Sequence, residues 1–123
     1  MSMGAQAGFE IRRVYDSVVP GYRVLVDRLW PRGINKQRAA IDEWLKDAAP
    51  SSDLRRWFGH DPDRFEEFTG RYRAELARPP ASDQVAHLLD LSRDRRVALV
   101  TATRDVQHSG ATVLLDYLVS GQR

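Results

Sequence analysis

The stretch YRVLVDRLWPRG, residues 22–33, decides the fold class that the sequence predicts. Its apolar run is almost continuous. That is typical of a strand buried on both faces of a parallel sheet, because a half-exposed strand alternates polar and apolar side chains. We therefore predict a buried strand over about residues 23–29, with Asp27, Arg28 and Arg32 at its carboxyl end.

Three other stretches have strand character. RRVALVTA, residues 95–102, is a second continuous apolar run, and FEIRRVY, residues 9–15, alternates as a short strand does. IDEWLKDAAP, residues 41–50, fits either a short strand or the end of a helix stopped by Pro50, and we prefer the strand.

The clearest helix is DPDRFEEFTGRYRAEL, residues 61–76. Asp61 is a natural N-cap, and Pro62 suits the first helical position. An apolar stripe at helical spacing predicts the buried face: Phe65, Phe68, Tyr72 and Leu76.

Three further helices are predicted from caps and amphipathic spacing. SSDLRRWFG, residues 51–59, has a serine cap and a closing Gly59. SDQVAHLLDLS, residues 82–92, is expected to be capped by Ser82. ATVLLDYLV, residues 111–119, is expected to close the chain, and the loop at residues 31–40 has room for one helical turn.

This order of elements predicts an α/β fold: a small, mostly parallel central sheet with helices on both faces. A chain of 123 residues is expected to form a single domain. We place that domain at residues 9–120, after a flexible N-terminal lead at residues 1–8.

Composition limits the environment and the chemistry. The sequence contains no cysteine, so disulfides, a thiolate nucleophile and cysteine-ligated zinc are excluded. No apolar segment is long enough to span a membrane, and the N-terminus does not have the pattern of a signal peptide, so we expect a cytoplasmic protein without a membrane partner. The net charge of +2 is weak evidence for nucleic-acid binding.

Three blocks together, VDRLWPRG, APSSDLRRWFGHDPDRFEEFTGRYRAEL and LVTATRDVQHSGATVLLDYL, resemble the DUF488 family in its short single-domain form. The resemblance covers residues 11–118. It implies a compact α/β fold and no agreed biochemical function. The family pattern AAKDxxHN is replaced here by TATRDVQHSG, with Arg104 for a lysine and Ser109 for an asparagine. Longer relatives tend to carry a cysteine near the position of Thr101, so thiol chemistry in those relatives does not carry over.

The candidate site lies where two predicted strands end. Ligands of open α/β sheets bind at the carboxyl ends of the strands, and two polar loops leave those ends here. If the strands are parallel neighbours, one crevice gathers these side chains: Asp27, Arg28, Arg32, Thr103, Arg104, Asp105, His108 and Ser109. The structural alternative is a salt-bridge network, with Asp27 paired to Arg104 or Arg28 paired to Asp105.

In the functional interpretation, an anion is held by Arg28, Arg32, Arg104, Thr103 and Ser109. His108 is the candidate proton carrier, and Asp27 is the second candidate catalytic residue. The alternative is that His108, Asp105 and Ser109 only form the start of a helix. We predict no metal site, because His60-Asp61 has no second histidine pair nearby and Asp61 is explained as an N-cap.

Two hypotheses of function follow. The first is an anion-binding pocket in an enzyme that acts on a phosphorylated or nucleotide-like small molecule. The second is a non-enzymatic binding module, which could contact nucleic acid through the arginines and aromatic residues of LRRWFGHDPDRF. The sequence indicates neither a cofactor nor an oligomeric state.

Overall fold

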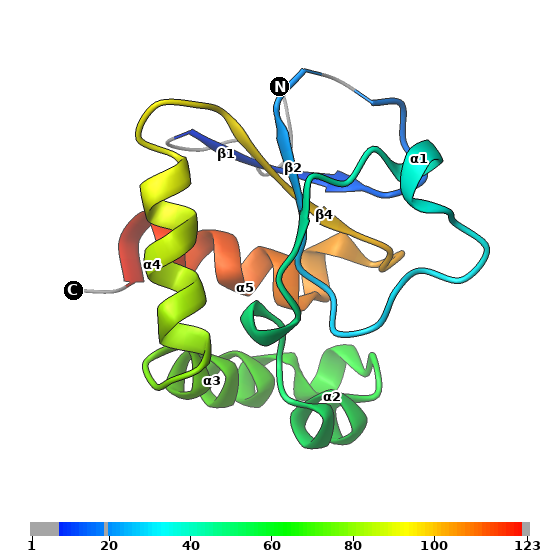
Figure 1. Cartoon of the computed structure of the whole chain (residues 1–123). Helices are drawn as coiled ribbons and strands as arrows, with labels where there is room; N and C mark the ends of the chain where they lie inside the picture. Colours follow the sequence, from blue (N-terminus) through cyan, green and yellow to red (C-terminus); the bar gives the residue numbers. More distant parts are fainter. Residues whose placement is uncertain (1–7, 19, 122–123) are drawn as a thin grey trace.

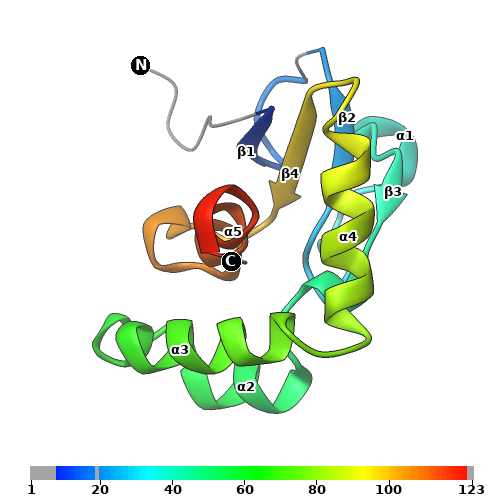
Figure 2. The same cartoon turned by 90° about the vertical axis from the view of Figure 1, so that its left-hand side faces the viewer.

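The centre of the molecule is a four-stranded parallel sheet (Figure 1), whose strands lie in the order β1-β4-β2-β3 (Figure 2). The structure is a computed structural model that describes residues 8–18 and 20–121. The strands are β1 (Phe9–Arg13), β2 (Tyr22–Leu25), β3 (Glu43–Trp44) and β4 (Val97–Thr101). The predicted lead at residues 1–8 lies outside the described residues, apart from Gly8.

β4 pairs with both of the other long strands. Val97 is in register with Phe9 on one side and with Tyr22 on the other, and both pairings are parallel. All five residues of β4 are buried, which explains why their run shows no polar alternation. The predicted parallel sheet with its two buried strands as neighbours is confirmed.

The strand predicted at residues 23–29 is shorter than expected. β2 ends at Leu25, and the Val26 N–H makes a last hydrogen bond to the Val100 carbonyl at 3.0 Å. After this bond the chain leaves the sheet, and the side chains of Asp27 and Arg28 bond to the end of β4 and to the segment before α2.

Four helices lie on one face of the sheet: α2 (Ser52–Phe58), α3 (Phe65–Leu76), α4 (Ala81–Leu91) and α5 (Gly110–Asp116). α5 packs directly against β1 and β4, and α3 packs against α5, with α2 beside α3 (Figure 2). α5 continues into a π-helical turn, Tyr117–Gly121. The main core lies between these helices and the sheet, and includes Val24, Val26, Leu99, Phe68, Tyr72 and Leu114.

The other face is covered more thinly. The single-turn helix α1 (Lys36–Ala39) and the loop around it cover a small second core. There Leu25 and Val100 pack with Trp30 and Trp44, whose rings meet edge to face at 5.4 Å. Helices therefore lie on both faces, but in unequal amounts.

Capping residues mark the ends of α2 and the start of the turn that leads into α3. The Ser51 side chain accepts a hydrogen bond from the Leu54 N–H at the start of α2, and Gly59 ends that helix with a φ of 56°. Asp61 caps a 3-10 turn, Pro62–Arg64, which leads into α3.

The predicted cap at Ser82 is wrong. α4 already begins at Ala81, after Pro80, and the Ser82 N–H donates to the Arg78 carbonyl, so Ser82 lies inside the first turn. In the described part of the chain, no helix combines the length and the apolar character needed to cross a bilayer.

Candidate functional site

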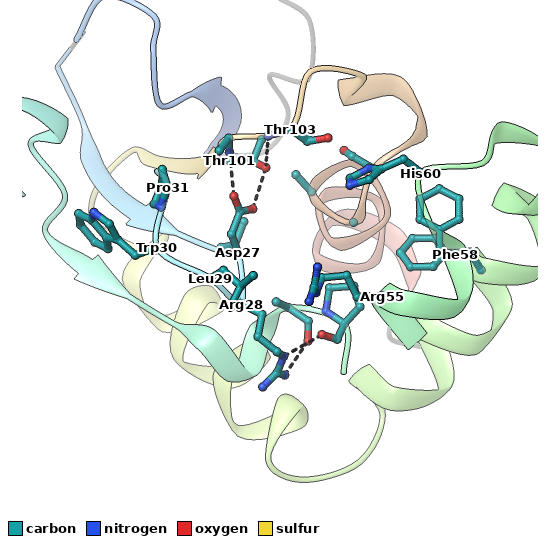
Figure 3. Close-up of a pocket in the computed structure, with 18 of the residues that line it drawn as sticks. Asp27, Arg28, Leu29, Trp30, Pro31, Arg55, Phe58, His60, Thr101 and Thr103 are labelled. Carbon is teal, nitrogen blue, oxygen red and sulfur yellow. Dashed lines mark hydrogen bonds between the residues drawn. The ribbon is translucent and has the colours of Figure 1, made fainter. Parts of the chain in front are cut away.

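A pocket of about 420 Å³ opens at the carboxyl ends of β2 and β4 (Figure 3). Three segments build its walls: the loop after β2, residues around α2, and the chain from the end of β4 to the start of α5. The charged, imidazole or hydroxyl-bearing side chains of its lining are Asp27, Arg28, Arg32, Arg55, His60, Thr101, Thr103 and Ser109. The apolar lining includes Leu29, Pro31, Pro50, Phe58 and Phe68.

Asp27 is fixed to the end of β4. Its carboxylate accepts hydrogen bonds from the Thr101 hydroxyl at 2.7 Å and from the Ala102 N–H at 2.8 Å. The Thr103 N–H donates to the same Thr101 hydroxyl, so three polar groups form one chain along the pocket wall (Figure 3). Burial raises the pKa of Asp27, although both hydrogen bonds act in the opposite direction.

Arg28 extends away from Asp27 toward the segment before α2 (Figure 3). Its Nε donates to the Pro50 carbonyl at 2.9 Å, its Nη2 donates to the Ala49 carbonyl at 3.3 Å, and its Nη1 lies 3.7 Å from Asp47. All three guanidinium nitrogens of Arg28 therefore contact other groups of the protein. In this structure Arg28 stabilises the pocket wall.

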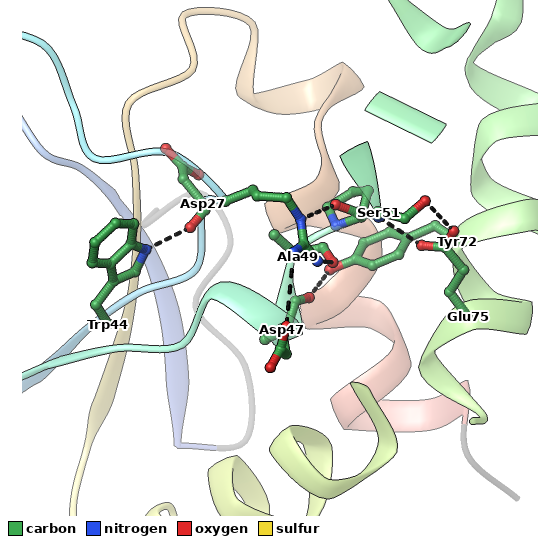
Figure 4. Close-up of polar contacts among 10 residues, drawn as sticks. Asp27, Trp44, Asp47, Ala49, Ser51, Tyr72 and Glu75 are labelled. Carbon is green, nitrogen blue, oxygen red and sulfur yellow. Dashed lines mark hydrogen bonds and ion pairs between the residues drawn. The ribbon is translucent and has the colours of Figure 1, made fainter. Parts of the chain in front are cut away.

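The same segment is held from its other side by α3. The Tyr72 hydroxyl donates to the Ala48 carbonyl, and Glu75 accepts hydrogen bonds from both the N–H and the hydroxyl of Ser51 (Figure 4). The two sets of contacts fix this wall of the pocket relative to the strand loop.

Two exposed arginines belong to the pocket lining. Arg32 and Arg55 are exposed, and no hydrogen bond or ion pair of either side chain occurs among the residues that the structure describes. The neighbouring arginine of α2, Arg56, instead pairs with Asp53 and does not line the pocket. His60 lies across the pocket from Asp27 (Figure 3).

The loop after β4 contributes fewer side chains to the pocket lining than predicted. The His108 ring bonds to the Asp105 carboxylate at 2.9 Å and packs edge to face on Phe65. This hydrogen bond lowers the pKa of Asp105. Neither residue lines the pocket, and nor does the exposed Arg104.

Ser109 does line the pocket, but its hydroxyl is occupied. It donates to the Val106 carbonyl at 2.6 Å and accepts from the Thr112 N–H at 3.4 Å, as the N-cap of α5. The interpretation of Ser109 and Asp105 as caps is confirmed, since Asp105 also caps the 3-10 turn Val106–His108.

The structure therefore brings five of the predicted site residues to one pocket: Asp27, Arg28, Arg32, Thr103 and Ser109. The two salt bridges of the structural alternative are wrong, because Asp27 bonds to the end of β4 and Arg28 bonds to the segment before α2. The binding and catalytic roles of these residues stay predictions.

Three of the charged, imidazole or hydroxyl-bearing pocket residues were not predicted as site residues, namely Arg55, His60 and Thr101. The sequence does contain a signal for Arg55. This arginine lies three residues before the buried Phe58 on a short helix, and this spacing places both side chains on the same side of that helix. Residues 8–18 and 20–121 contain no group of three side chains arranged to hold a metal ion.

Comparison with known proteins gives one family. A family model described as "Inactive DUF488-N3 subclade" matches residues 8–122. The uncharacterized protein Rv3073c of Mycobacterium tuberculosis (strain H37Rv) is 46% identical over 110 residues, which cover 88% of this chain and 91% of that protein. The uncharacterized protein YeaO of Escherichia coli K12 is 38% identical over 113 residues, or 90% and 96% of the two chains. No solved structure matches the chain.

Proposed function

The chain belongs to the DUF488 family, and we propose that it is a non-catalytic module that binds a small anionic molecule in the pocket at the ends of β2 and β4. The observation that carries the proposal is the pair Arg32 and Arg55. Both line the pocket, and neither has a partner of opposite charge among the described residues. Guanidinium groups bind phosphates and carboxylates through paired hydrogen bonds.

The size of the pocket supports a small molecule over a nucleic acid. A volume of about 420 Å³ falls within the roughly 300–1,000 Å³ typical of small-molecule sites. Its largely apolar lining with a few polar groups also fits this class of ligand.

Three observations favour binding over catalysis. The subclade is described as inactive, and the sequence has no cysteine to act as a nucleophile. His108, the proton carrier predicted from the sequence, does not line the pocket and is bonded to Asp105. The competing hypothesis is the enzyme that acts on a phosphorylated or nucleotide-like small molecule.

The test is calorimetric titration of the protein with inorganic phosphate and with a panel of sugar phosphates and nucleoside monophosphates. We expect at least one of these anions to bind, and Arg55→Ala to weaken it by about tenfold or more, the effect of losing a charged hydrogen bond of roughly 1.5–3 kcal/mol. Arg56→Ala is the matched control on the same helix and should leave the affinity unchanged.

Three results would contradict the proposal. If no anion of the panel binds, or if Arg55→Ala and Arg56→Ala behave alike, the pocket is not the anion site. Release of phosphate or sugar from a bound compound, followed by chromatography, would show an enzyme instead of a binding module.

A further inference from the structure

The pocket holds a carboxylate, that of Asp27, which forms no ion pair within residues 8–18 and 20–121, although the charge of His60 across the pocket acts to lower its pKa. Both oxygens of Asp27 accept hydrogen bonds, but the donors, the Thr101 hydroxyl and the Ala102 N–H, are neutral. Within the described residues, no arginine, lysine or histidine lies at ion-pair distance from Asp27. Arg28, which is adjacent in sequence, is turned toward Ala49 and Pro50. A partly buried charge without a counter-ion is costly, and a ligand cation would remove that cost.

The same pocket holds two arginines that form no ion pair with any residue in the described part of the chain. Arg32 and Arg55 line it, and neither comes within ion-pair distance of Asp27. Opposite charges that share a cavity without meeting are suited to a ligand that carries both charges, because one molecule can then satisfy both ends.

Apolar side chains line much of the same pocket. Phe58, Phe68 and Pro50 line the pocket, and Leu29, of which 59% is exposed, lies at its edge. Figure 3 shows Asp27 on one side of the pocket and Arg55 and Phe58 on the other. A short hydrocarbon segment would contact these side chains.

We infer that the ligand has two charged ends: an ammonium group bound by Asp27 and a phosphate or carboxylate bound by Arg32 and Arg55, joined by a short aliphatic linker. This inference rests on the proposed function, since it names the chemical class of the ligand in the same pocket. The ammonium group donates to the lone pairs that Asp27 does not use toward Thr101 and Ala102.

The experiment compares pairs of probes that differ only in the amine. Aminoalkyl phosphates with two, three and four carbons are titrated beside ethyl, propyl and butyl phosphate, by calorimetry on the full chain. In at least one pair, the amine should strengthen binding by about tenfold or more, the usual effect of a charge-assisted hydrogen bond. Asp27→Asn should bring the two affinities of that pair together, and Arg56→Ala should keep the preference.

The outcomes separate the inference from the proposed function. If the unmodified protein binds each pair equally well, the inference is overturned and the anion pocket stands. If it binds neither member of any pair, the inference is overturned, and the titrations with inorganic phosphate, sugar phosphates and nucleoside monophosphates decide the proposed function. A preference for the amine that persists in Asp27→Asn would also overturn the inference, because the ammonium group would then be held elsewhere. The first two results are decided by the affinities of the unmodified protein alone, so they need no variant.

Discussion

The Thr101 hydroxyl donates a 2.7 Å hydrogen bond to the carboxylate of Asp27, a residue 74 positions earlier in the chain. This contact joins the segment after β2 to the end of β4, next to the last backbone hydrogen bond between the two strands. It thereby fixes the carboxylate at the wall of the pocket, where its protonation and its hydrogen bonds affect both stability and binding.

Replacing Thr101 by valine keeps the shape of the side chain and removes the donor. Thr101 is 2% exposed, so the lost bond is not replaced by bulk water, and the Thr103 N–H loses its acceptor as well. We expect a loss of about 1–3 kcal/mol in the free energy of unfolding, measured with urea. Thr103→Val is the control, since the hydrogen bonds recorded for Thr103 use its backbone, and it should cost much less.

The pH dependence of Asp27 follows from its raised pKa. Between the pKa of the unfolded chain and the higher pKa of the folded protein, the folded state binds the proton more strongly, so stability from this group falls as the pH rises. An asparagine amide at this position would not carry the cost of the buried charge, and its oxygen can still accept from the Ala102 N–H. We therefore expect Asp27→Asn to be at least as stable as the parent at neutral pH in urea unfolding. A clear destabilisation at neutral pH would show that the charge itself holds the loop.

Glu43 has the opposite dependence. The Tyr22 hydroxyl donates to one of its oxygens at 2.6 Å, and His87 of α4 bonds to the other at 2.8 Å. Burial alone would raise the pKa of Glu43, but these two hydrogen bonds, together with the charges of His87 and Arg95, hold that pKa below its usual value. The stability from Glu43 is therefore present above the pKa of the unfolded chain and is lost as the pH falls through the lowered folded pKa.

Glu43→Gln tests this contact directly. The variant should be less stable than the parent near neutral pH, and the difference should shrink in acid, where Glu43 itself is protonated. Glu66→Gln, on the exposed side of α3, is the control. Equal stability of Glu43→Gln and the parent across the pH series would rule out a role for this contact.

Phe68 lies at the centre of the main core. It is 2% exposed and stacks on Phe58 with ring centroids 4.2 Å apart. Phe68→Ala should cost roughly 3–5 kcal/mol in urea unfolding, the usual range for a core phenylalanine. Phe65→Ala should cost less, because Phe65 is only partly buried.

Arg104 tests the expectation drawn from the sequence, which placed it among the anion ligands. Because it is exposed and does not line the pocket, we now expect Arg104→Ala to leave phosphate binding unchanged, whereas Arg55→Ala weakens it. Loss of binding in Arg104→Ala alone would move the anion site to the loop after β4.

The sequence predicts the fold well where burial leaves a pattern. The continuous apolar runs place β2 and β4, and Asp61 and Ser51 mark helix starts, because these signals depend on neighbouring residues only. The reach of Arg28 to the Ala49 and Pro50 carbonyls leaves no such pattern. It depends on how α2 and α3 pack against the sheet, and sequence spacing does not contain that information.

Dependence on tertiary packing also explains which residues of the candidate site were predicted from the sequence and which were not. Asp27 and Arg32 were found because strand ends predict a shared edge, which follows from topology. Arg55 reaches the pocket from α2, and His60 reaches it from the turn that follows α2, so only the tertiary structure brings them there.

The position of β4 sets a constraint on how the chain acquires its structure. The strand between β1 and β2 comes from residues 97–101, near the end of the sequence, so Phe9 gains its partner only after Val97 has been made. During translation, the edges of β1 and β2 that β4 will cover emerge first and remain unpaired. Pairings between such distant residues also slow folding, because the loop must close before any contact stabilises it. A chain released before residue 97 would lack the strand that joins β1 to β2, and with it the wall of the pocket that holds Asp27.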